Sequence, residues 1–482
     1  MSEENRTVGK VDQTDKSAQV TKAALWYTVS SILIRGVSLF TAPIFTRLLS
    51  TSDYGVASNF SSWANIVMCI TGLGLETAVV RGKVDFEKNY KRYLSSVQFL
   101  EIIWCGICDV VLLLGINFWS SFMSLDNLCI IVMTAYIILA PSLTYGQIDI
   151  RFDYKYKENV AISIINTIIS IGAAIGLIYL WNDKRYFGRI VGLVLPSVIF
   201  GLWFLIRIFR QGKCFYNKDY WQYALKISVP MIPHGLAMII LGQIDRVMIT
   251  RYCGESAAGI YSFGYSYAVL LSVVTNAISD AVQPQLYEML NNGKEKDMAA
   301  YSYRMMLIGV LLTILVIGVG PEALRILGTE PYFEARWVIF PVAVGTLMQY
   351  LYQFFGIIEV YSKKTIYMAI GSCGAAAVNY LLNWLLIPRY GFIIAAYTTL
   401  IAYGLLMIFH FFMARVAYKK KIFNIVPIIS ITAIIFVAGL GINLVYDNFL
   451  IRIIILAVII IGMTFYLRDD IVVIAKKILK KS

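Results

Sequence analysis

The chain has 482 residues, of which 59% are hydrophobic and 15% charged, and its mean hydropathy is +0.70. A water-soluble chain of this length could not cover so much apolar surface, because its exterior needs more polar residues than the sequence supplies. The composition excludes a soluble globular protein and indicates a polytopic membrane protein. Such a protein either moves something across a bilayer or acts on something embedded in one.

Long apolar runs alternate with short charged connectors. About fourteen runs, each of roughly 17–27 mostly uncharged residues, are long enough to cross a ~30 Å hydrocarbon core as helices. Because the connectors are short, we expect an all-α membrane protein whose functional residues lie inside the helical bundle. The predicted spans are about 23–46, 54–80, 93–118, 127–149, 159–181, 186–208, 222–249, 257–283, 300–323, 337–360, 365–387, 391–414, 424–446 and 448–467.

Basic residues gather on alternate connectors. About 30 of the 42 Lys and Arg fall on the side that holds both termini, and about nine on the other side. By the positive-inside rule, both termini are then cytoplasmic and the number of spans is even. The net charge of +13 follows from this topology and requires no nucleic-acid partner. Residues 1–22 are polar, so we expect a cytoplasmic tail and no signal peptide.

Two segments match at a constant offset of 204 residues, and both link the first span of a six-span unit to the second. The matched residues are Arg47 and Arg251, Ser52 and Ser256, Gly55 and Gly259, Ser58 and Ser262, Thr71 and Thr275, and Glu76 and Asp280. An offset of six spans keeps the orientation of the chain. We therefore expect parallel repeats, related by an axis along the membrane normal.

The repeat divides the chain into four parts. Residues 1–22 form the cytoplasmic tail, 23–210 an N-lobe of six spans, and 211–418 a C-lobe of six spans. Residues 419–482 hold two extra spans and a basic cytoplasmic tail. We expect the lobes to face each other across a central cavity, which is the architecture of an alternating-access transporter.

Three basic residues within the spans are candidates for substrate binding. A full charge in hydrocarbon costs from ~3 to more than ~10 kcal/mol, so such residues line wet cavities or form ion pairs. Arg35 lies near the middle of the first span and needs a carboxylate, a carbonyl or a hydrated anionic ligand. It is a cavity residue or a member of a structural ion pair. Lys226 and Arg246 lie near the two ends of the seventh span, where either could also reach the interface.

The acidic residues and one histidine within the spans are candidates for ion coupling or charge pairing. Glu76 and Asp280 are related by the repeat. Glu101 and Asp109 are eight residues apart, just over two turns, and so lie on roughly one side of the third span. The acids could neutralise a buried arginine or relay a coupling ion, and the pattern leaves both open. His234 is either a structural histidine or a protonation site.

Prolines interrupt several spans. Pro230 and Pro233 break the seventh span directly before His234, and Pro43 follows the middle of the first. Proline removes a backbone hydrogen bond and bends a helix, which membrane helices tolerate where they line cavities. We therefore expect these three prolines to mark kinks or gating positions.

At these residues the chain resembles a known family. The run from Pro43 to Gly55 is similar to the opening signature of Wzx-type flippases, and Pro230–Pro233 with Asp245-Arg246-Val-Met-Ile is similar to their second-lobe signature. These are polysaccharide-biosynthesis transporters of the multidrug/oligosaccharidyl-lipid/polysaccharide exporter superfamily. The likeness in length, spans and duplicated lobes covers the whole chain.

The resemblance implies a carrier that flips undecaprenyl-diphosphate-linked oligosaccharide repeat units to the outer leaflet of the bacterial cytoplasmic membrane. The product would be capsule, O-antigen or exopolysaccharide. It also implies a cationic cavity in which Arg35 binds the diphosphate or an acidic sugar, and coupling to an ion gradient. The implied partners are the lipid-linked glycan, membrane lipids, and the polysaccharide polymerase with its chain-length machinery. The sequence contains no Walker A loop, and we expect no cofactor and no metal site.

Other functions remain open at this point. A multidrug or small-molecule exporter of the same superfamily would favour an acidic cavity for drug cations, whereas Arg35 favours an anion. A lipid II flippase would share the lipid-diphosphate chemistry. A membrane polysaccharide polymerase or ligase would need a catalytic outward loop. The short outward connectors hold no cluster of His, Asp or Arg, which argues against an enzyme.

Overall fold

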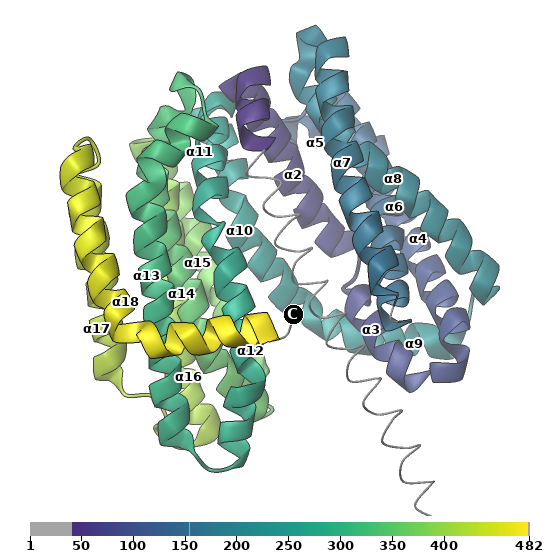
Figure 1. Cartoon of the computed structure of the whole chain (residues 1–482). Coiled ribbons are helices and arrows are strands. Elements are labelled where there is room, and N and C mark those ends of the chain that lie inside the picture. The colour runs from purple at the N-terminus through teal and green to yellow at the C-terminus, as the bar shows by residue number, and fades with distance from the viewer. Residues whose placement is uncertain (1–40, 154, 481–482) are drawn as a thin grey trace, which may run out of the picture.

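The computed structural model describes residues 41–153 and 155–480, and over this part of the chain the regular structure is helical (Figure 1). Short 3-10 turns occur at Glu87–Asn89, Asn182–Lys184, Val229–Met231 and Glu330–Ala335. The numbered α-helices are α2 (Thr51–Thr71), α3 (Leu75–Asp85), α4 (Tyr90–Leu114), α5 (Ile116–Met123), α6 (Asn127–Phe152), α7 (Tyr156–Leu180), α8 (Arg185–Gly212), α9 (Lys218–Ser228), α10 (Ile232–Cys253), α11 (Glu255–Ala268), α12 (Leu271–Asn291), α13 (Glu295–Leu327), α14 (Arg336–Tyr361), α15 (Ile366–Tyr390), α16 (Ile394–Tyr418), α17 (Ile425–Leu444) and α18 (Phe449–Lys480).

The described residues contain twelve helical segments that are long and apolar enough to cross a membrane. A thirteenth is counted if α2 and α3, which meet at a bend of 47°, form one span. This confirms an all-helical membrane protein. The predicted first span, 23–46, lies almost wholly outside the described residues, so the total of fourteen stays a prediction.

The helices form two bundles that stand side by side and meet at one end (Figure 1). The N-terminal bundle contains α2 to α8, with α9 packed against α3 and α4. The C-terminal bundle contains α10 to α16, and α17 and α18 pack against the outer side of α13. Contact between the bundles runs mainly through α2, which packs against α10 and α11.

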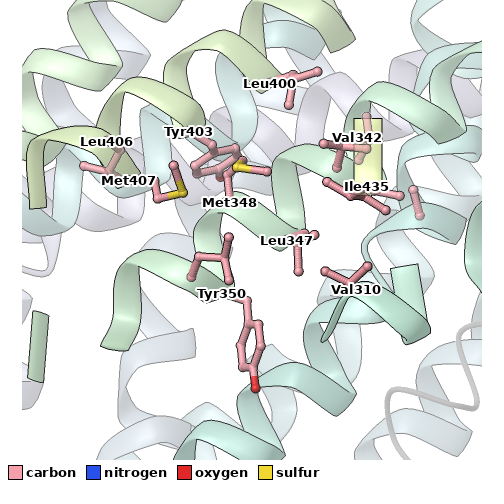
Figure 2. Packing of buried hydrophobic residues seen from close by; sticks show 14 of the residues in the cluster. Val310, Val342, Leu347, Met348, Tyr350, Leu400, Tyr403, Leu406, Met407 and Ile435 are labelled. Carbon is pink, nitrogen blue, oxygen red and sulfur yellow. The ribbon is translucent and has the colours of Figure 1, made fainter. Parts of the chain in front are cut away.

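The two bundles differ in how their apolar side chains are buried. In the C-terminal bundle they form one continuous cluster that extends from Ala237 to Leu456. Figure 2 shows part of it, where Met348 of α14 packs with Tyr403 and Met407 of α16. The buried apolar residues of the described N-terminal bundle fall into four separate clusters. The C-terminal bundle therefore has the more continuous core.

Candidate functional site

The two repeated motifs meet where the bundles join. α2 begins at Thr51, where Ser50 and Asp53 form a capping box, and α11 begins at the repeat-related residue Glu255. The helices cross at Gly55 and Gly259. A Cβ atom on Gly55 would lie 1.9 Å from the Glu255 carbonyl oxygen, and one on Gly259 would lie 1.9 Å from the Thr51 oxygen. Only glycine permits this approach. We call this contact, Leu49–Gly55 with Glu255–Gly259, the closed end.

Polar side chains bond the bundles together at the closed end. The hydroxyls of Thr51 and Ser256 are 2.7 Å apart, and the Ser52 hydroxyl donates to Glu255 Oε2 at 2.6 Å. The Tyr332 hydroxyl donates to the Ser50 carbonyl oxygen at 2.9 Å. Further from this end, Ser62 Oγ donates to Gln243 Oε1 at 3.0 Å. On the other side of the closed end, Thr46 Oγ1 donates to the Leu327 carbonyl oxygen at 2.8 Å, and Thr329 Oγ1 donates to the Thr46 carbonyl oxygen at 3.4 Å.

A cavity of about 240 Å³ lies between the bundles next to the closed end. A second cavity, of about 440 Å³, shares Tyr54, Arg189 and Ser266 with the first. Helices of both bundles supply the walls, so the cavities lie between the bundles. The polar residues that line the first cavity are Tyr54, Ser58, Ser61, Asn65, Arg189, Gln243, Arg246, Ser262 and Ser266.

Two arginines line the first cavity from opposite bundles. Arg189 of α8 stacks 3.6 Å from the ring centre of Phe45. Arg246 of α10 lies 4.3 Å from the ring centre of Tyr265 and donates from Nη1 to the Gly242 carbonyl at 2.9 Å. No described carboxylate lies within ion-pair distance of either guanidinium. The cavity therefore holds two positive charges that an anionic ligand could neutralise.

Asp245 precedes Arg246 in the chain but points into the C-terminal bundle. Its carboxylate accepts hydrogen bonds from the Tyr261 hydroxyl at 2.5 Å, Thr399 Oγ1 at 2.6 Å and Asn383 Nδ2 at 2.7 Å. Successive residues on a helix point about 100° apart, so one faces the core and the other faces the cavity. The Asp245 carboxylate is therefore hydrogen-bonded inside the C-terminal bundle and does not neutralise Arg246, whose guanidinium faces the cavity.

The structure places the predicted substrate-binding residues in different regions. Arg246 lines the cavity, whereas Lys226 is exposed on α9 at the other end of the molecule. Arg35 lies outside the described residues. Arg189 also lines the cavity but was not among the predicted substrate-binding residues, although the predicted span 186–208 contains it. In the structure it lies one turn into α8, which begins at Arg185. Its position just inside a span was the signal that could have identified it.

The predicted coupling residues are also separated. Glu76 of α3 and Asp280 of α12 are exposed, whereas Glu101 and Asp109 are buried in α4 with 2% and 8% exposure. No described basic side chain lies within 4 Å of either buried acid. The His234 ring is hydrogen-bonded to Ser372 Oγ at 2.9 Å, between α10 and α15. None of these five residues lines the two cavities.

The predicted kink residues lie at helix breaks or within helical segments. Pro230 occupies the 3-10 turn that separates α9 from α10, and Pro233 is the second residue of α10. Pro43 lies in the helical residues 41–48. The seventh span is therefore divided at Val229–Met231, where α9 ends and α10 begins.

The family model of the polysaccharide biosynthesis proteins matches residues 20–290. The chain therefore belongs to the polysaccharide biosynthesis protein family, as its resemblance to the Wzx-type flippases predicts.

Relatives agree with this membership. The chain is 19% identical over 394 residues to the probable low-salt glycan biosynthesis flippase Agl15 of Haloferax volcanii, covering 79% of this chain and 80% of that protein. It is 22% identical over 287 residues to the succinoglycan biosynthesis transport protein ExoT of Rhizobium meliloti, covering 58% and 56%. The fold is similar to that of the lipid II flippase MurJ in its inward closed conformation, with a TM-score of 0.71, 14% identity, and coverage of 92% and 99%.

Proposed function

We propose that the chain flips undecaprenyl-diphosphate-linked oligosaccharide repeat units from the cytoplasmic to the outer leaflet of the bacterial cytoplasmic membrane. The units would serve the assembly of capsule, O-antigen or exopolysaccharide. One observation carries the proposal: Arg189 and Arg246 reach one cavity from opposite bundles, and neither has a described carboxylate partner. Family membership supports a glycan as the substrate, and the two arginines support a preference for an anionic lipid headgroup.

The chemistry of the cavity fits a diphosphate with an attached sugar. A diphosphate offers several acceptor oxygens, which the planar fork of an arginine binds in pairs. Ser58, Ser61, Asn65 and Gln243 add neutral hydrogen-bonding groups suited to sugar hydroxyls. The described lining of both cavities contains no carboxylate, so a cationic drug would meet only repulsion from the two guanidiniums.

Alternating access of two lobes, 23–210 and 211–418, would move this substrate. The positive-inside rule puts the connectors that contain Arg47 and Arg251 outside, so the closed end faces outward and the state is inward-facing. The repeat-related starts of α2 and α11 and their crossing at glycines support lobes related by an axis along the membrane normal. Release of the glycan would then require the closed end to separate.

Arg35 would add a third positive charge to this site. Its predicted place near the middle of the first span makes a hydrated anion a suitable partner. We expect Arg35→Ala to lose flipping while the protein still inserts, since removal of a charge makes insertion easier. Arg35→Lys should recover only part of the activity, because the ammonium lacks the planar fork. Loss of the folded protein with normal flipping by the remaining copies would instead assign Arg35 to a structural ion pair.

An ion gradient would drive the cycle. The candidates for the coupling site are Glu76, Glu101, Asp109, Asp280 and His234. Buried acids within a span are the stronger candidates, because such groups are retained in hydrocarbon only where they have a role or a partner. This favours Glu101 and Asp109 over the exposed Glu76 and Asp280.

The function is tested in cells that need this chain for their surface polymer. Deletion should abolish the polymer and leave the lipid-linked repeat unit in the inner leaflet, measured by its protection from an impermeant sugar-modifying reagent. Arg246→Ala should reproduce the defect. Arg251→Ala, an exposed arginine on the same helix, is the matched control and should restore the polymer. Normal polymer with altered drug sensitivity in the deletion strain would favour an exporter, and a defect in cell-wall precursor supply would favour a lipid II flippase.

A further inference from the structure

Two broken spans touch each other beside the junction of the bundles. The first break separates α2 from α3 at Gly72–Gly74, where Leu73 and Gly74 have positive φ values of 49° and 63°. The second break is the 3-10 turn between α9 and α10. A Cβ atom on Gly74 would lie 3.3 Å from the carbonyl oxygen of Ser228, the last residue of α9. A change in the bend between α2 and α3 would therefore be transmitted to the break in the seventh span.

Side chains of α4 bond the end of α2 at the first break. Trp104 Nε1 donates to the Ile70 carbonyl at 3.4 Å, and Cys105 Sγ lies 3.7 Å from the Thr71 carbonyl oxygen. One turn earlier, Glu101 Oε1 lies 3.6 Å from the position that a Cβ atom on Gly72 would occupy. The Glu101 carboxyl group therefore lies beside the break.

Glu101 lacks, among the described residues, the basic partner that usually accompanies a buried carboxylate. The residue is 2% exposed, and its Oε2 atom has no hydrogen-bond partner. The titratable groups that face it are Glu76 of α3, Tyr145 of α6 and Cys105 on its own helix. No Lys, Arg or His of the described residues is within 4 Å of its carboxyl group. Neighbouring groups therefore offer no positive charge to stabilise ionised Glu101.

Both the bilayer and the helix end favour the protonated form of Glu101. An uncompensated charge at this depth costs several kcal/mol, and the carbonyl groups at the end of α2 add partial negative charge. A protonated carboxyl group avoids this cost and carries one O–H donor. If the bend changes and water reaches the carboxyl group, the O–H bond breaks, the proton passes to water and a hydrated carboxylate remains. The protonation state of Glu101 then depends on the angle between α2 and α3.

We propose that Glu101 is the proton-binding site of this transporter and that it couples a proton gradient to the bend between α2 and α3. The inference rests on the proposed flipping function and adds the identity of the coupling ion and its carrier. It predicts that flipping is driven by a pH difference across the membrane. Glu359, a buried acid whose Oε1 lies 2.8 Å from His410 Nδ1, has the compensating partner that Glu101 lacks and serves as the matched control.

The test measures flipping of a lipid-diphosphate oligosaccharide by the full chain in proteoliposomes, with and without a pH difference. In the wild type the pH difference should accelerate flipping. Glu101→Gln, which mimics the protonated side chain, should show an acceleration at least tenfold smaller than that of the wild type. Glu101→Asp should keep the acceleration with a shifted pH dependence, and Glu359→Gln should keep it unchanged.

The outcomes separate this inference from the proposed function. If the wild type does not flip the lipid in either condition, the proposed function fails. If the wild type flips it and Glu101→Gln still responds to the pH difference, only the proton site is overturned. Loss of flipping in Glu101→Gln under both conditions would assign a structural role. Infrared difference spectra add a readout without transport, since the band of a protonated carboxylic acid should be present in the wild type and absent in Glu101→Gln.

Discussion

The two bundles differ in the partners that they offer to charged side chains buried in their spans. In the C-terminal bundle Asp245 accepts three hydrogen bonds, Glu359 is paired with His410, and Arg452 of α18 is bonded to Glu322 of α13. In the N-terminal bundle Glu101 has no basic partner among the described residues.

The same contrast holds for the apolar core, which is continuous in the C-terminal bundle and divided into four clusters in the N-terminal one. Asp149, a buried acid of the N-terminal bundle that does have a basic partner, lies near a helix end beside Lys91. A continuous core whose buried charges have partners resists deformation, whereas a divided core with a broken span and an acid without a basic partner can change shape. We infer that the C-terminal bundle is the rigid part and the N-terminal bundle carries the coupling.

The largest effect expected from this contrast is on stability. Asp245→Ala leaves three buried donors, on Tyr261, Thr399 and Asn383, without their acceptor. At about 1–3 kcal/mol for each orphaned group, the loss should be about 4 kcal/mol. Thermal unfolding of the purified protein in detergent measures it. Asp280→Ala, an exposed acid of the same bundle, should change stability by less than about 0.5 kcal/mol. An equal loss from both variants would contradict a satisfied C-terminal core.

A smaller effect, confined to transport, is expected at the cavity. Arg246→Ala removes one of the two guanidiniums that face it, and a hydrogen bond to a charged group contributes about 1.5–3 kcal/mol. The flipping rate in proteoliposomes should fall about 10- to 100-fold. The melting temperature should change little, because Arg246 has no described ion-pair partner to lose. Unchanged flipping would exclude Arg246 from substrate binding.

Substitution of a glycine at the closed end should make the contact between α2 and α11 about 2 kcal/mol less favourable. Gly55→Ala puts a methyl group 1.9 Å from the Glu255 carbonyl, so α2 and α11 must move apart. We expect a cysteine at Ser256 to become more accessible to an impermeant thiol reagent in this variant. Gly242→Ala is the control, since a Cβ atom there meets no atom within 4 Å. Equal accessibility in both variants would mean that the glycine crossing does not hold the closed end.

The smallest expected effect is on the stability of the Glu101 variant. If Glu101 is protonated in this state, Glu101→Gln replaces one neutral side chain by another of similar shape. The unfolding free energy should change by less than about 1 kcal/mol, whereas Glu359→Gln, which removes the carboxyl group hydrogen-bonded to His410 Nδ1, should lose about 2 kcal/mol. The same detergent melting experiment compares them, and a larger loss from Glu101→Gln would reverse the contrast between the bundles.

The sequence predicted the helices because the length of an apolar run and the charge of its connectors depend only on local composition. It also singled out Arg246 as a basic residue within a span; the structure places this residue in the cavity lining, and its role in substrate binding stays a prediction. Lys226 lies within the candidate span Lys218–Cys253, as predicted, but it is exposed on α9, before the 3-10 turn that contains Pro230.

Contacts between distant helices could not be predicted from the same patterns. The repeat was visible at Gly55 and Gly259, but nothing in it indicates that the two copies touch each other. The Glu359–His410 pair joins α14 to α16, and neither residue has a local pattern that points to the other. Asp245 likewise receives its partners from α11, α15 and α16, which only tertiary packing brings together.

Cross-linking of the closed end tests the central claim, that the bundles must separate there to move the substrate. The hydroxyls of Thr51 and Ser256 are 2.7 Å apart, so Thr51→Cys with Ser256→Cys places two thiols within bonding distance. Each single variant is the control. Oxidation of the double variant should stop flipping in proteoliposomes, and a reductant should restore it, while the single variants stay active throughout. Full flipping by the cross-linked protein would contradict the account.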